Sequence, residues 1–250
     1  MNHNHISYDD YDYSEFWKGR DYEDRSDKIA IARLFRAIPV TRNKLIDIGA
    51  GRGRLVPLYE AAWREFVLLD SSQRQIDEAR NNIADPKKAT LFVGTAEAIQ
   101  FPDATFDTAL CTRVFHYLPD PTKVVREMAR ILKPDGYLVL EIPNKLHFKN
   151  RLKALFGNDR NAAFSPDPIS RAKEFDTVFV NHNPKTIQKL LEFNNFQVIE
   201  ILSVSNFRSA FLKKILPVSF LVMLEKFLQK PLASFWFGPS IYFLARKMVK

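Results

Sequence analysis

Hydrophobic positions between residues 45 and 142 gather in short runs, separated by segments of helical periodicity. Such short runs are typical of buried parallel strands. The expected strands are Leu45–Ile48, Phe66–Leu69, Thr90–Val93, Phe106–Cys111 and Tyr137–Ile142, and the expected helices are Arg52–Ala62, Gln73–Ile83 and Pro121–Leu132. Strands that alternate with helices predict a doubly wound α/β fold, in which ligands bind at the carboxyl ends of the strands.

The first run ends in a glycine-rich turn, with Gly49, Gly51 and Gly53 at alternate positions and Asp47 just before them. Glycine allows positive φ and close approach of a ligand, and a helix that follows offers free N–H groups. The turn predicts a nucleotide cradle, although a turn that binds nothing is the alternative. A P-loop is excluded because no GK[ST] follows. The carboxylate of Asp47 disfavours a pyrophosphate and suits a cation or an ammonium group.

Two further carboxylates follow the next strands. Asp70 ends the second run, 17 residues after Gly53, where a carboxylate accepts hydrogen bonds from ribose hydroxyls. The alternative is an N-cap for the helix that starts near Ser72, and Asp70 can serve both ends. Glu97 follows the third run. Three carboxylates at strand ends are hard to explain by packing alone.

Four blocks, in this order, resemble the class I S-adenosylmethionine-dependent methyltransferases, specifically the small-molecule group called type 11. They are DIGAGRG, LLDSS, GTAEAIQFPDATFD and REMARILKPDGYLVLEIPN. The resemblance covers about residues 40–145 closely and the C-terminal third loosely. It implies a Rossmann-like seven-stranded sheet, mostly parallel with an antiparallel last strand. We expect this strand at Ser240–Arg246, paired with Phe196–Val204.

The resemblance also implies the cofactor S-adenosyl-L-methionine and a set of residues that bind it. Asp47 would lie near its methionyl amino group, Asp70 would hold the ribose, and Glu97 would lie beside the adenine amino group. Arg20, in the string FWKGRDYE, is a candidate partner of the methionyl carboxylate, unless it pairs with Asp21 or Asp24 on the surface. The full expected set is Asp47, Gly49, Gly51, Gly53, Asp70, Ser71, Ala96, Glu97, Arg113 and Arg20.

Candidate catalytic residues lie in Cys111–Asp120, just past the fourth strand. Methyl transfer needs alignment above all, and a base only if the nucleophile arrives protonated. His116 is a candidate base because neutral histidine accepts a proton near pH 7. Tyr117 is a candidate for orienting a nucleophile or packing against the sulfonium. The alternative is that this aromatic pair only closes the core.

Other histidines are weaker candidates. These are His147 and His182, whereas His3 and His5 show no metal-ligand spacing. We therefore expect no bound metal.

We expect one domain built in three parts. Residues 1–40 form an N-terminal lid or helical element, residues 41–145 form the core that binds the cofactor, and residues 146–250 complete the same domain. Insertions at 146–183 and 207–232 are expected to select the substrate, because such long connections are commonly functional.

Local signals place further elements in these parts. Aromatic residues are frequent before residue 23 and are expected to be buried, and a helix is expected near Ser26–Ala37. Asn183-Pro184 predicts the start of the helix Lys185–Phe193, and Lys133–Gly136 predicts a loop.

Residues 207–230 combine a broad apolar face with lysines, and Pro217 is expected to break or kink the helix. One interpretation is a cap on the substrate pocket or a homodimer face. The other is a surface that meets a membrane or a lipid-like substrate.

Composition adds limits to these predictions. A chain of 250 residues with 46% hydrophobic residues has material for one core. The single cysteine, Cys111, lies in an apolar strand and is expected to be buried and reduced. No secretory h-region or membrane-spanning run is present, so we expect a cytoplasmic protein, with a location at the membrane periphery as the alternative. The net charge of +8 is spread along the chain, without a recognisable nucleic-acid-binding module.

Together these features predict a methyltransferase that modifies oxygen, nitrogen or carbon of a small metabolite, hydrophobic or lipid-like in character. The alternatives are an RNA or protein methyltransferase on the same fold, a nucleotide-binding oxidoreductase, and a non-catalytic protein that retains the cofactor fold.

Overall fold

The computed structural model describes residues 17–39, 42–156, 164–174 and 177–249. Side chains are described throughout these ranges except at 171–174 and 177–178. Most of the aromatic N-terminal segment (residues 1–16) lies outside the described residues. The expected burial of its rings is confirmed for Tyr22, which is fully buried, and stays a prediction for the rings before residue 17.

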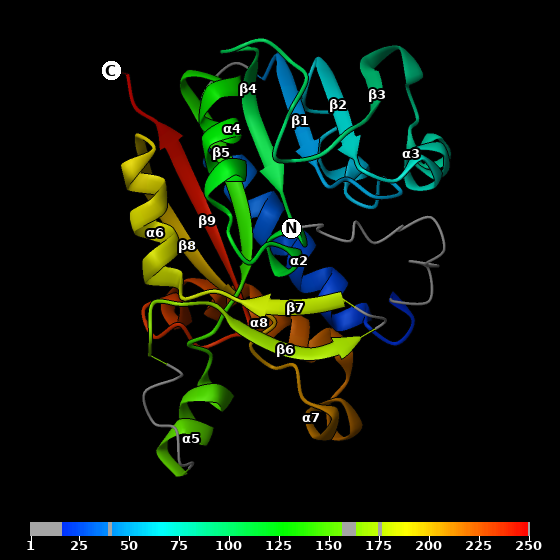
Figure 1. Cartoon of the computed structure of the whole chain (residues 1–250). Coiled ribbons are helices and arrows are strands. Elements are labelled where there is room, and N and C mark those ends of the chain that lie inside the picture. Colours follow the sequence, from blue (N-terminus) through cyan, green and yellow to red (C-terminus); the bar gives the residue numbers. More distant parts are fainter. Residues whose placement is uncertain (1–16, 40–41, 157–163, 175–176, 250) are drawn as a thin grey trace.

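A seven-stranded sheet forms the centre of the molecule, and helices cover both of its faces (Figure 1). Its strand order is β3-β2-β1-β4-β5-β9-β8. These strands are β1 (Lys44–Ile48), β2 (Glu65–Asp70), β3 (Ala89–Val93), β4 (Phe106–Cys111), β5 (Leu132–Pro143), β8 (Phe196–Val204) and β9 (Ser240–Lys247). The helices are α2 (Asp21–Arg36), α3 (Gln73–Ala79), α4 (Thr122–Ile131), α5 (Phe148–Phe156), α6 (Pro184–Phe193), α7 (Ala210–Ile215) and α8 (Val218–Ala233).

The predicted sheet topology is confirmed. β1 pairs in parallel with β2 and β4, and β9 pairs antiparallel with both β5 and β8. β4 and β8 have the bounds expected from their apolar runs, and β9 extends the expected strand by one residue. The fold is therefore α/β and Rossmann-like, with an antiparallel last strand.

Alternate strand residues supply two separate cores. Ile46 and Ile48 of β1 face the side covered by α4 and α6. Leu45 faces the other side, where α2 and α3 pack. This alternation follows from the two-residue period of a strand, and it explains why runs without polar positions became the central strands. Cys111 is fully buried in the first of these cores, as expected.

The helix expected at Arg52–Ala62 is wrong. This segment forms successive turns around one short 3-10 helix, η2 (Val56–Leu58). Pro57 explains the difference, because its missing N–H prevents an α-helical hydrogen bond and its ring crowds the preceding turn. The glycine loop therefore leads into turns, and no α-helix N-terminus points at the site from this segment.

The expected loop at Lys133–Gly136 is part of β5, as an irregularity in the strand. Phe106 pairs with Leu132 and Thr108 pairs with Tyr137, so four residues of β5 face one residue of β4. Asp135 has a φ of 62° there, which lets the backbone bulge before pairing resumes. The turn residues were correctly recognised, and the structure accommodates them as a bulge.

The late part of the chain adds a hairpin and helices beyond the carboxyl ends of the strands. The hairpin consists of β6 (Ile169–Glu174) and β7 (Thr177–Asn181), and in Figure 1 it lies below the arrowheads of β1, β2 and β4. Pro217 separates α7 from α8, as expected. Asn183 caps α6 by accepting a hydrogen bond from the Lys185 amide. Among the helices that the structure describes, none is both long and apolar enough to cross a membrane.

Candidate active site

The glycine loop follows β1 in a conformation that suits glycine. Gly49, Gly51 and Gly53 have φ values of 72°, 52° and 75°. A Cβ on Gly49 would lie 2.2 Å from Cγ2 of Val114, which no side chain tolerates without movement. The loop thus needs glycine both for its backbone angles and for the close approach of the chain after β4.

Asp70, at the end of β2, holds this loop in place. Its two carboxylate oxygens accept hydrogen bonds from the Gly51 amide at 2.8 Å and from the Ser72 amide at 3.0 Å. The N-cap of α3 is Ser72, whose hydroxyl accepts from the Gln75 amide. The capping role considered for Asp70 therefore belongs to Ser72. Each Asp70 oxygen keeps a second lone pair with which it can accept a ligand hydroxyl.

Asp47 is a buried carboxyl beneath the loop. It is 2% exposed, and it accepts a hydrogen bond of 3.0 Å from the Tyr59 hydroxyl. Burial raises the pKa of Asp47 to about 7, against the opposing effects of the Tyr59 hydrogen bond and of the Arg54 charge. Since an ionised carboxylate without a paired cation is costly to bury, this group is suited to receive a cationic ligand group.

An ion-pair cluster that the sequence did not reveal closes one side of the cavity. Arg54 donates to Asp24 at 2.5 Å and to Asp27 at 3.4 Å. Arg113 donates to both oxygens of Asp27, at 2.9 and 3.2 Å. The Trp17 ring lies against both guanidinium groups. Its centroid is 4.0 Å from Cζ of Arg54 and 5.6 Å from Cζ of Arg113. Two cations therefore sit side by side at the cavity, held by buried Asp27.

Arg113 is also fixed through its backbone. Its φ is 61°, and its amide donates to buried Glu141 of β5 at 3.0 Å. Burial lowers the pKa of Arg113, but the charges of Asp27 and Glu141 outweigh this effect and raise it. Its Nε has no hydrogen-bond partner among the described atoms although it is buried. The expected place of Arg113 at the site is thus matched by a charged, oriented side chain.

A cavity lies between the glycine loop and the start of the segment after β4. Its lining includes five expected residues, namely Asp47, Gly49, Gly51, Arg113 and His116. It also includes Trp17, Arg54, Gln75 and Thr112, which sequence reasoning missed. Gln75 is 2% exposed, and neither atom of its side-chain amide has a partner among the described atoms. The sequence feature that could have predicted Gln75 is its position in the first turn of the helix that follows Asp70.

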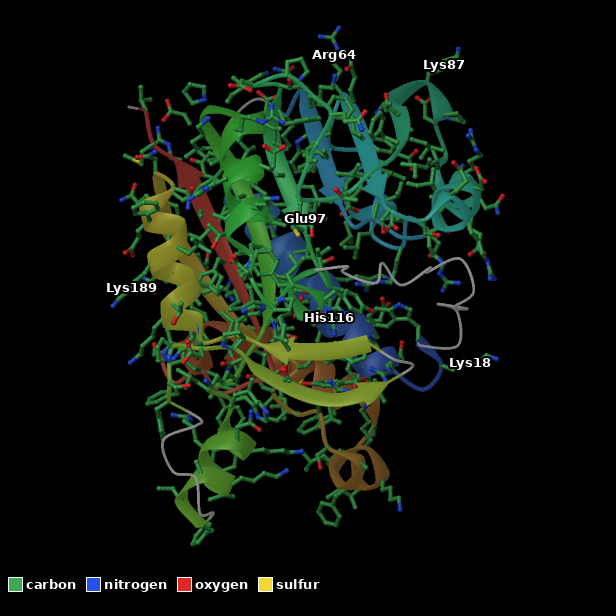
Figure 2. The ribbon with its side chains drawn as sticks, in the orientation of Figure 1. Lys18, Arg64, Lys87, Glu97, His116 and Lys189 are labelled. Atoms are coloured by element: carbon green, nitrogen blue, oxygen red, sulfur yellow. The ribbon has the colours of Figure 1, made fainter. Side chains whose placement is uncertain are left out.

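The other expected cofactor residues do not line this cavity. Gly53 packs against Val56 and Ala79, Ser71 is exposed beside Asp70, and Ala96 packs on the core. Glu97 is half-buried, and Figure 2 shows it near the ends of the central strands. Arg20 immediately precedes α2, and its amide donates to the Trp17 carbonyl at 3.0 Å. Asp70 is also absent from the lining, so the binding roles of these six residues stay predictions.

His116 and Tyr117 form an aromatic cluster with Phe179 of β7. Both lie on the short helix η5 (Phe115–Tyr117). The His116 ring is 3.9 Å from the Tyr117 ring and stacks on Phe179 at 5.4 Å, measured between centroids. Figure 2 shows His116 between the strand ends and the β6–β7 hairpin. Burial, together with the smaller effect of the Arg113 charge, lowers the pKa of His116 to about 3. The imidazole is therefore neutral at pH 7 and a weak base.

The two weaker histidine candidates are buried outside the cavity lining. Nε2 of His182 lies 2.8 Å from the carbonyl oxygen of Phe115, and its ring meets the Phe115 ring edge-on. His147 is 8% exposed, in the turn before α5. His182 thereby connects the hairpin to η5.

These features fit the group that the sequence resemblance implies. The loop leaves no room for a Cβ at Gly49, and Asp47 is a buried carboxyl. Among the described residues, the Gln75 amide has no hydrogen-bond partner and Asp47 forms no direct ion pair. Two guanidinium groups complete the cavity. An S-adenosyl-L-methionine molecule carries an ammonium, a carboxylate and ribose hydroxyls, and these complement Asp47, the arginines and Asp70 respectively.

Comparison with known proteins gives the same class. Residues 46–140 match the family model described as a methyltransferase domain. The matched segment thus has the sequence of a methyltransferase domain, and the predicted resemblance to the class I S-adenosyl-L-methionine-dependent methyltransferases is confirmed.

Individual relatives match over part of the chain. The uncharacterized methyltransferase YcgJ of Bacillus subtilis is 34% identical over 101 residues, which cover 39% of this chain and 40% of YcgJ. The 27-O-demethylrifamycin SV methyltransferase of Amycolatopsis mediterranei is 32% identical over 115 residues, 43% of this chain and 42% of that protein. The chain therefore spans about two fifths of the length of these two relatives.

Solved structures share the fold over most of the chain. The crystal structure of a SAM-dependent methyltransferase from Methanosarcina mazei has a TM-score of 0.58 at 19% identity and covers 86% of this chain and 97% of that one. Sequence identity this low carries the fold alone, so the acceptor has to be argued from the site.

Proposed function

We propose that this protein transfers the methyl group of S-adenosyl-L-methionine to an oxygen atom of a small, hydrophobic, ring-bearing acceptor. The observation that carries the acceptor class is the cluster of His116, Tyr117 and Phe179 at the glycine-loop cavity. Aromatic rings favour a flat apolar partner, by burial of surface and by ring contacts.

The cofactor, when bound, supplies a sulfonium methyl group that is displaced in line by a nucleophile. Asp47 would hold the amino group and Asp70 the ribose hydroxyls. Arg54 and Arg113 would hold the carboxylate, and the rigid pairing of both with Asp27 preserves their positions. The chain's contribution to rate is then mainly alignment, because these groups are fixed by contacts that exist before any ligand binds.

The acceptor hydroxyl has to be acidic. His116 is the imidazole in the cavity lining, and its pKa of about 3 makes it a poor proton acceptor at neutral pH. A phenol or enol reaches the anionic form without a strong base, releasing its proton to water before the oxygen–methyl bond forms. The relative from Amycolatopsis is named for an O-demethylated compound, which supports an oxygen acceptor.

The position of the β6–β7 hairpin beside η5 favours a small acceptor over a macromolecule. The hairpin β6–β7 lies across η5, and His182 ties the two together. Because Phe179 belongs to this hairpin, an acceptor that contacts the aromatic cluster has to fit beside the hairpin, which a single ring does more easily than a folded RNA or protein.

Calorimetry with S-adenosyl-L-methionine tests the cofactor half of the proposal. We expect binding by the wild type and no binding of NAD. Absence of cofactor binding would favour the non-catalytic alternative, and binding of NAD would favour an oxidoreductase.

A transfer assay tests the acceptor half. The release of S-adenosylhomocysteine is measured with substituted phenols, with total tRNA and with a protein mixture. We expect transfer to phenols, with KM raised about tenfold in Phe179→Ala because one aromatic contact is lost. Phe193→Ala on α6, an equally aromatic but remote change, should leave KM unaltered. Faster transfer to tRNA or protein would contradict the proposal.

A further inference from the structure

Apolar side chains are exposed together at one end of the molecule, on α5, α7, α8 and the segment after α8. Phe156 is 85% exposed, Phe227 is 69% exposed and Phe211 is 68% exposed. We name this set the apolar end; it consists of Phe148, Leu152, Leu155, Phe156, Phe211, Ile215, Phe220, Met223, Phe227 and Phe235. A concentration of exposed apolar side chains on neighbouring elements is a candidate interaction site.

The core does not account for these residues. A different set faces the rest of the chain: Leu221 of α8 is buried against Tyr22 of α2, and the partly buried Leu212 and Leu216 pack on this cluster. On α8 the exposed Phe220, Met223 and Phe227 recur at intervals of three and four residues, so they form one outward stripe. The helix is therefore apolar on two sides, and among the described residues only one of these sides has a partner.

Two contacts join α5 to the other helices of the apolar end. Nζ of Lys149 on α5 donates to the carbonyl of Arg208, just before α7, at 3.4 Å. Phe148 stacks on Phe237, after α8, with centroids 5.2 Å apart. Figure 1 shows α5 and α7 projecting from the same end of the molecule. The prediction of an interaction surface at 207–230 thus extends to a second insertion, which sequence reasoning did not connect with it.

Basic residues accompany the apolar ones. α5 carries Lys149, Arg151 and Lys153, and neither α5 nor α7 contains an acidic residue. Lys214 and Lys226 are exposed on α7 and α8. The acid of α8, Glu225, is fully buried and bonds the Tyr22 hydroxyl and the Ser205 amide. The charge left at this surface is therefore positive.

This charge distribution discriminates between occupants. A second copy of the chain in a two-fold interface would place the same lysines and arginines opposite one another, which is repulsive. An anionic bilayer satisfies both features, because apolar side chains enter the acyl boundary while lysine and arginine meet the headgroups.

We infer that the apolar end binds the surface of an anionic lipid bilayer. The arrowheads of the parallel strands point toward the half of the molecule that carries α5 and α7 (Figure 1). Docking here would bring the acceptor side of the cavity close to the bilayer. A hydrophobic acceptor dissolved in lipid would then reach the site without crossing water.

Vesicle co-sedimentation of the full chain tests this inference. We expect binding to vesicles of phosphatidylcholine mixed with phosphatidylglycerol, and weak binding to phosphatidylcholine alone. Raising the salt concentration to about 0.5 M should weaken the binding, since exposed charges are then screened. Equal binding to both vesicle types, or to neither, would overturn the inference.

Paired variants separate the two features of the surface. Phe211→Ser/Phe227→Ser should lower the vesicle partition coefficient at least about tenfold, because two aromatic side chains that would enter the bilayer are removed. Lys214→Gln/Lys226→Gln should lower it about twenty-fivefold, at about fivefold per lysine. The controls are Phe193→Ser on α6 and Lys87→Gln/Lys189→Gln, whose lysines Figure 2 shows away from the apolar end. All variants should keep the wild-type melting temperature and S-adenosyl-L-methionine affinity.

Light scattering without lipid measures whether the apolar end instead binds a second copy of the chain. A stable dimer that dissociates in Phe211→Ser/Phe227→Ser, together with vesicle binding unchanged from wild type, would overturn the inference. Because the readout is lipid binding, its failure is distinct from a failure to transfer methyl groups.

Discussion

The two sides of the cavity are built in different ways. On the cofactor side, β1, β2 and the glycine loop are locked by hydrogen bonds, such as those from Gly51 and Ser72 to Asp70. On the acceptor side, η5 and the β6–β7 hairpin meet through stacked rings and through His182. Hydrogen bonds and backbone angles fix geometry closely, whereas ring contacts tolerate changes in shape and size.

This difference explains how one fold serves many acceptors. The cofactor side has few alternative sequences, because a loop with three positive φ angles and a contact at Val114 admits little variation. The acceptor side consists of late insertions whose residues are held mainly by apolar contact. Substitutions should therefore have large effects at the first side and graded effects at the second.

Gly49→Ala should have the largest effect. Its Cβ would lie 2.2 Å from Cγ2 of Val114, and φ is 72°. Overpacking and backbone strain together should cost about 3 kcal/mol of unfolding free energy. Because the loop must shift, S-adenosyl-L-methionine affinity should fall more than about a hundredfold. Chemical denaturation and calorimetry measure the two quantities.

Gly19→Ala is the matched control. Gly19 has a φ of 70°, and a Cβ there would meet nothing within 4 Å. We expect a loss of only about 1 kcal/mol, from backbone strain alone. Val114→Ala should partly rescue Gly49→Ala because it removes the methyl group in contact. If both alanine variants lose the same stability, contact with Val114 is not what restricts the loop.

Asp70→Ala should come next. It removes the acceptor of two backbone amides and the proposed acceptor of the ribose hydroxyls. Hydrogen bonds to a charged group contribute about 1.5–3 kcal/mol, so cofactor affinity should fall about thirtyfold. Asp77→Ala on α3, where the side chain is 55% exposed, should change affinity by less than about twofold. Wild-type affinity in Asp70→Ala would contradict the assigned role.

A pH effect of Asp47 should be smaller but more specific. Burial raises its pKa to about 7 from an ordinary value of 3.8. Below pH 7 the carboxyl becomes protonated and loses the charge that would hold an ammonium group. Affinity for S-adenosyl-L-methionine should thus fall about twentyfold between about pH 7.5 and 5.5, since the ionised fraction falls about tenfold for each unit well below the pKa. Asp47→Asn should bind weakly at both pH values, and a similar slope in that variant would assign the effect to another group.

The same shift fixes the sign of a stability effect. Between about pH 4 and 7 the folded chain keeps a proton on Asp47 that the unfolded chain has released. The contribution of Asp47 to the unfolding free energy therefore decreases as the pH rises through this window, and is constant above it. Denaturation of wild type and Asp47→Asn at both ends of the window measures the difference.

Local patterns were enough to predict most of the sheet and part of the site. The bounds of β4, the glycine loop and the placement of Asp47 and Asp70 at strand ends followed from short apolar runs and the residues after them. The bounds of β8 and the place of Arg113 followed from the family resemblance. These features depend on neighbours in sequence. The wrong prediction at residues 52–62 also has a local cause, because Pro57 prevents a continuous α-helix there.

The remaining parts depend on contacts between distant residues. Asp27 pairs with Arg113, which is 86 positions away in the sequence. Phe179 stacks on His116 from the β6–β7 hairpin, whose first strand, 169–174, is largely polar. Nothing within a local window signals such pairs. The apolar end likewise brings together segments near residues 150 and 215. The sequence showed each segment to be apolar but did not show that they are neighbours.

His116→Gln should have the smallest effect and separates two roles for this residue. If His116 were the general base, its loss would lower kcat by about a hundredfold or more and would remove one limb of the pH profile. Its pKa of about 3, set by burial and by Arg113, makes proton transfer to it unfavourable. We therefore expect kcat within about threefold of wild type and an unchanged pH profile, with KM raised because the ring stack with Phe179 is lost. A large fall in kcat with KM unchanged would show that the acceptor side, too, contains a precisely placed chemical group.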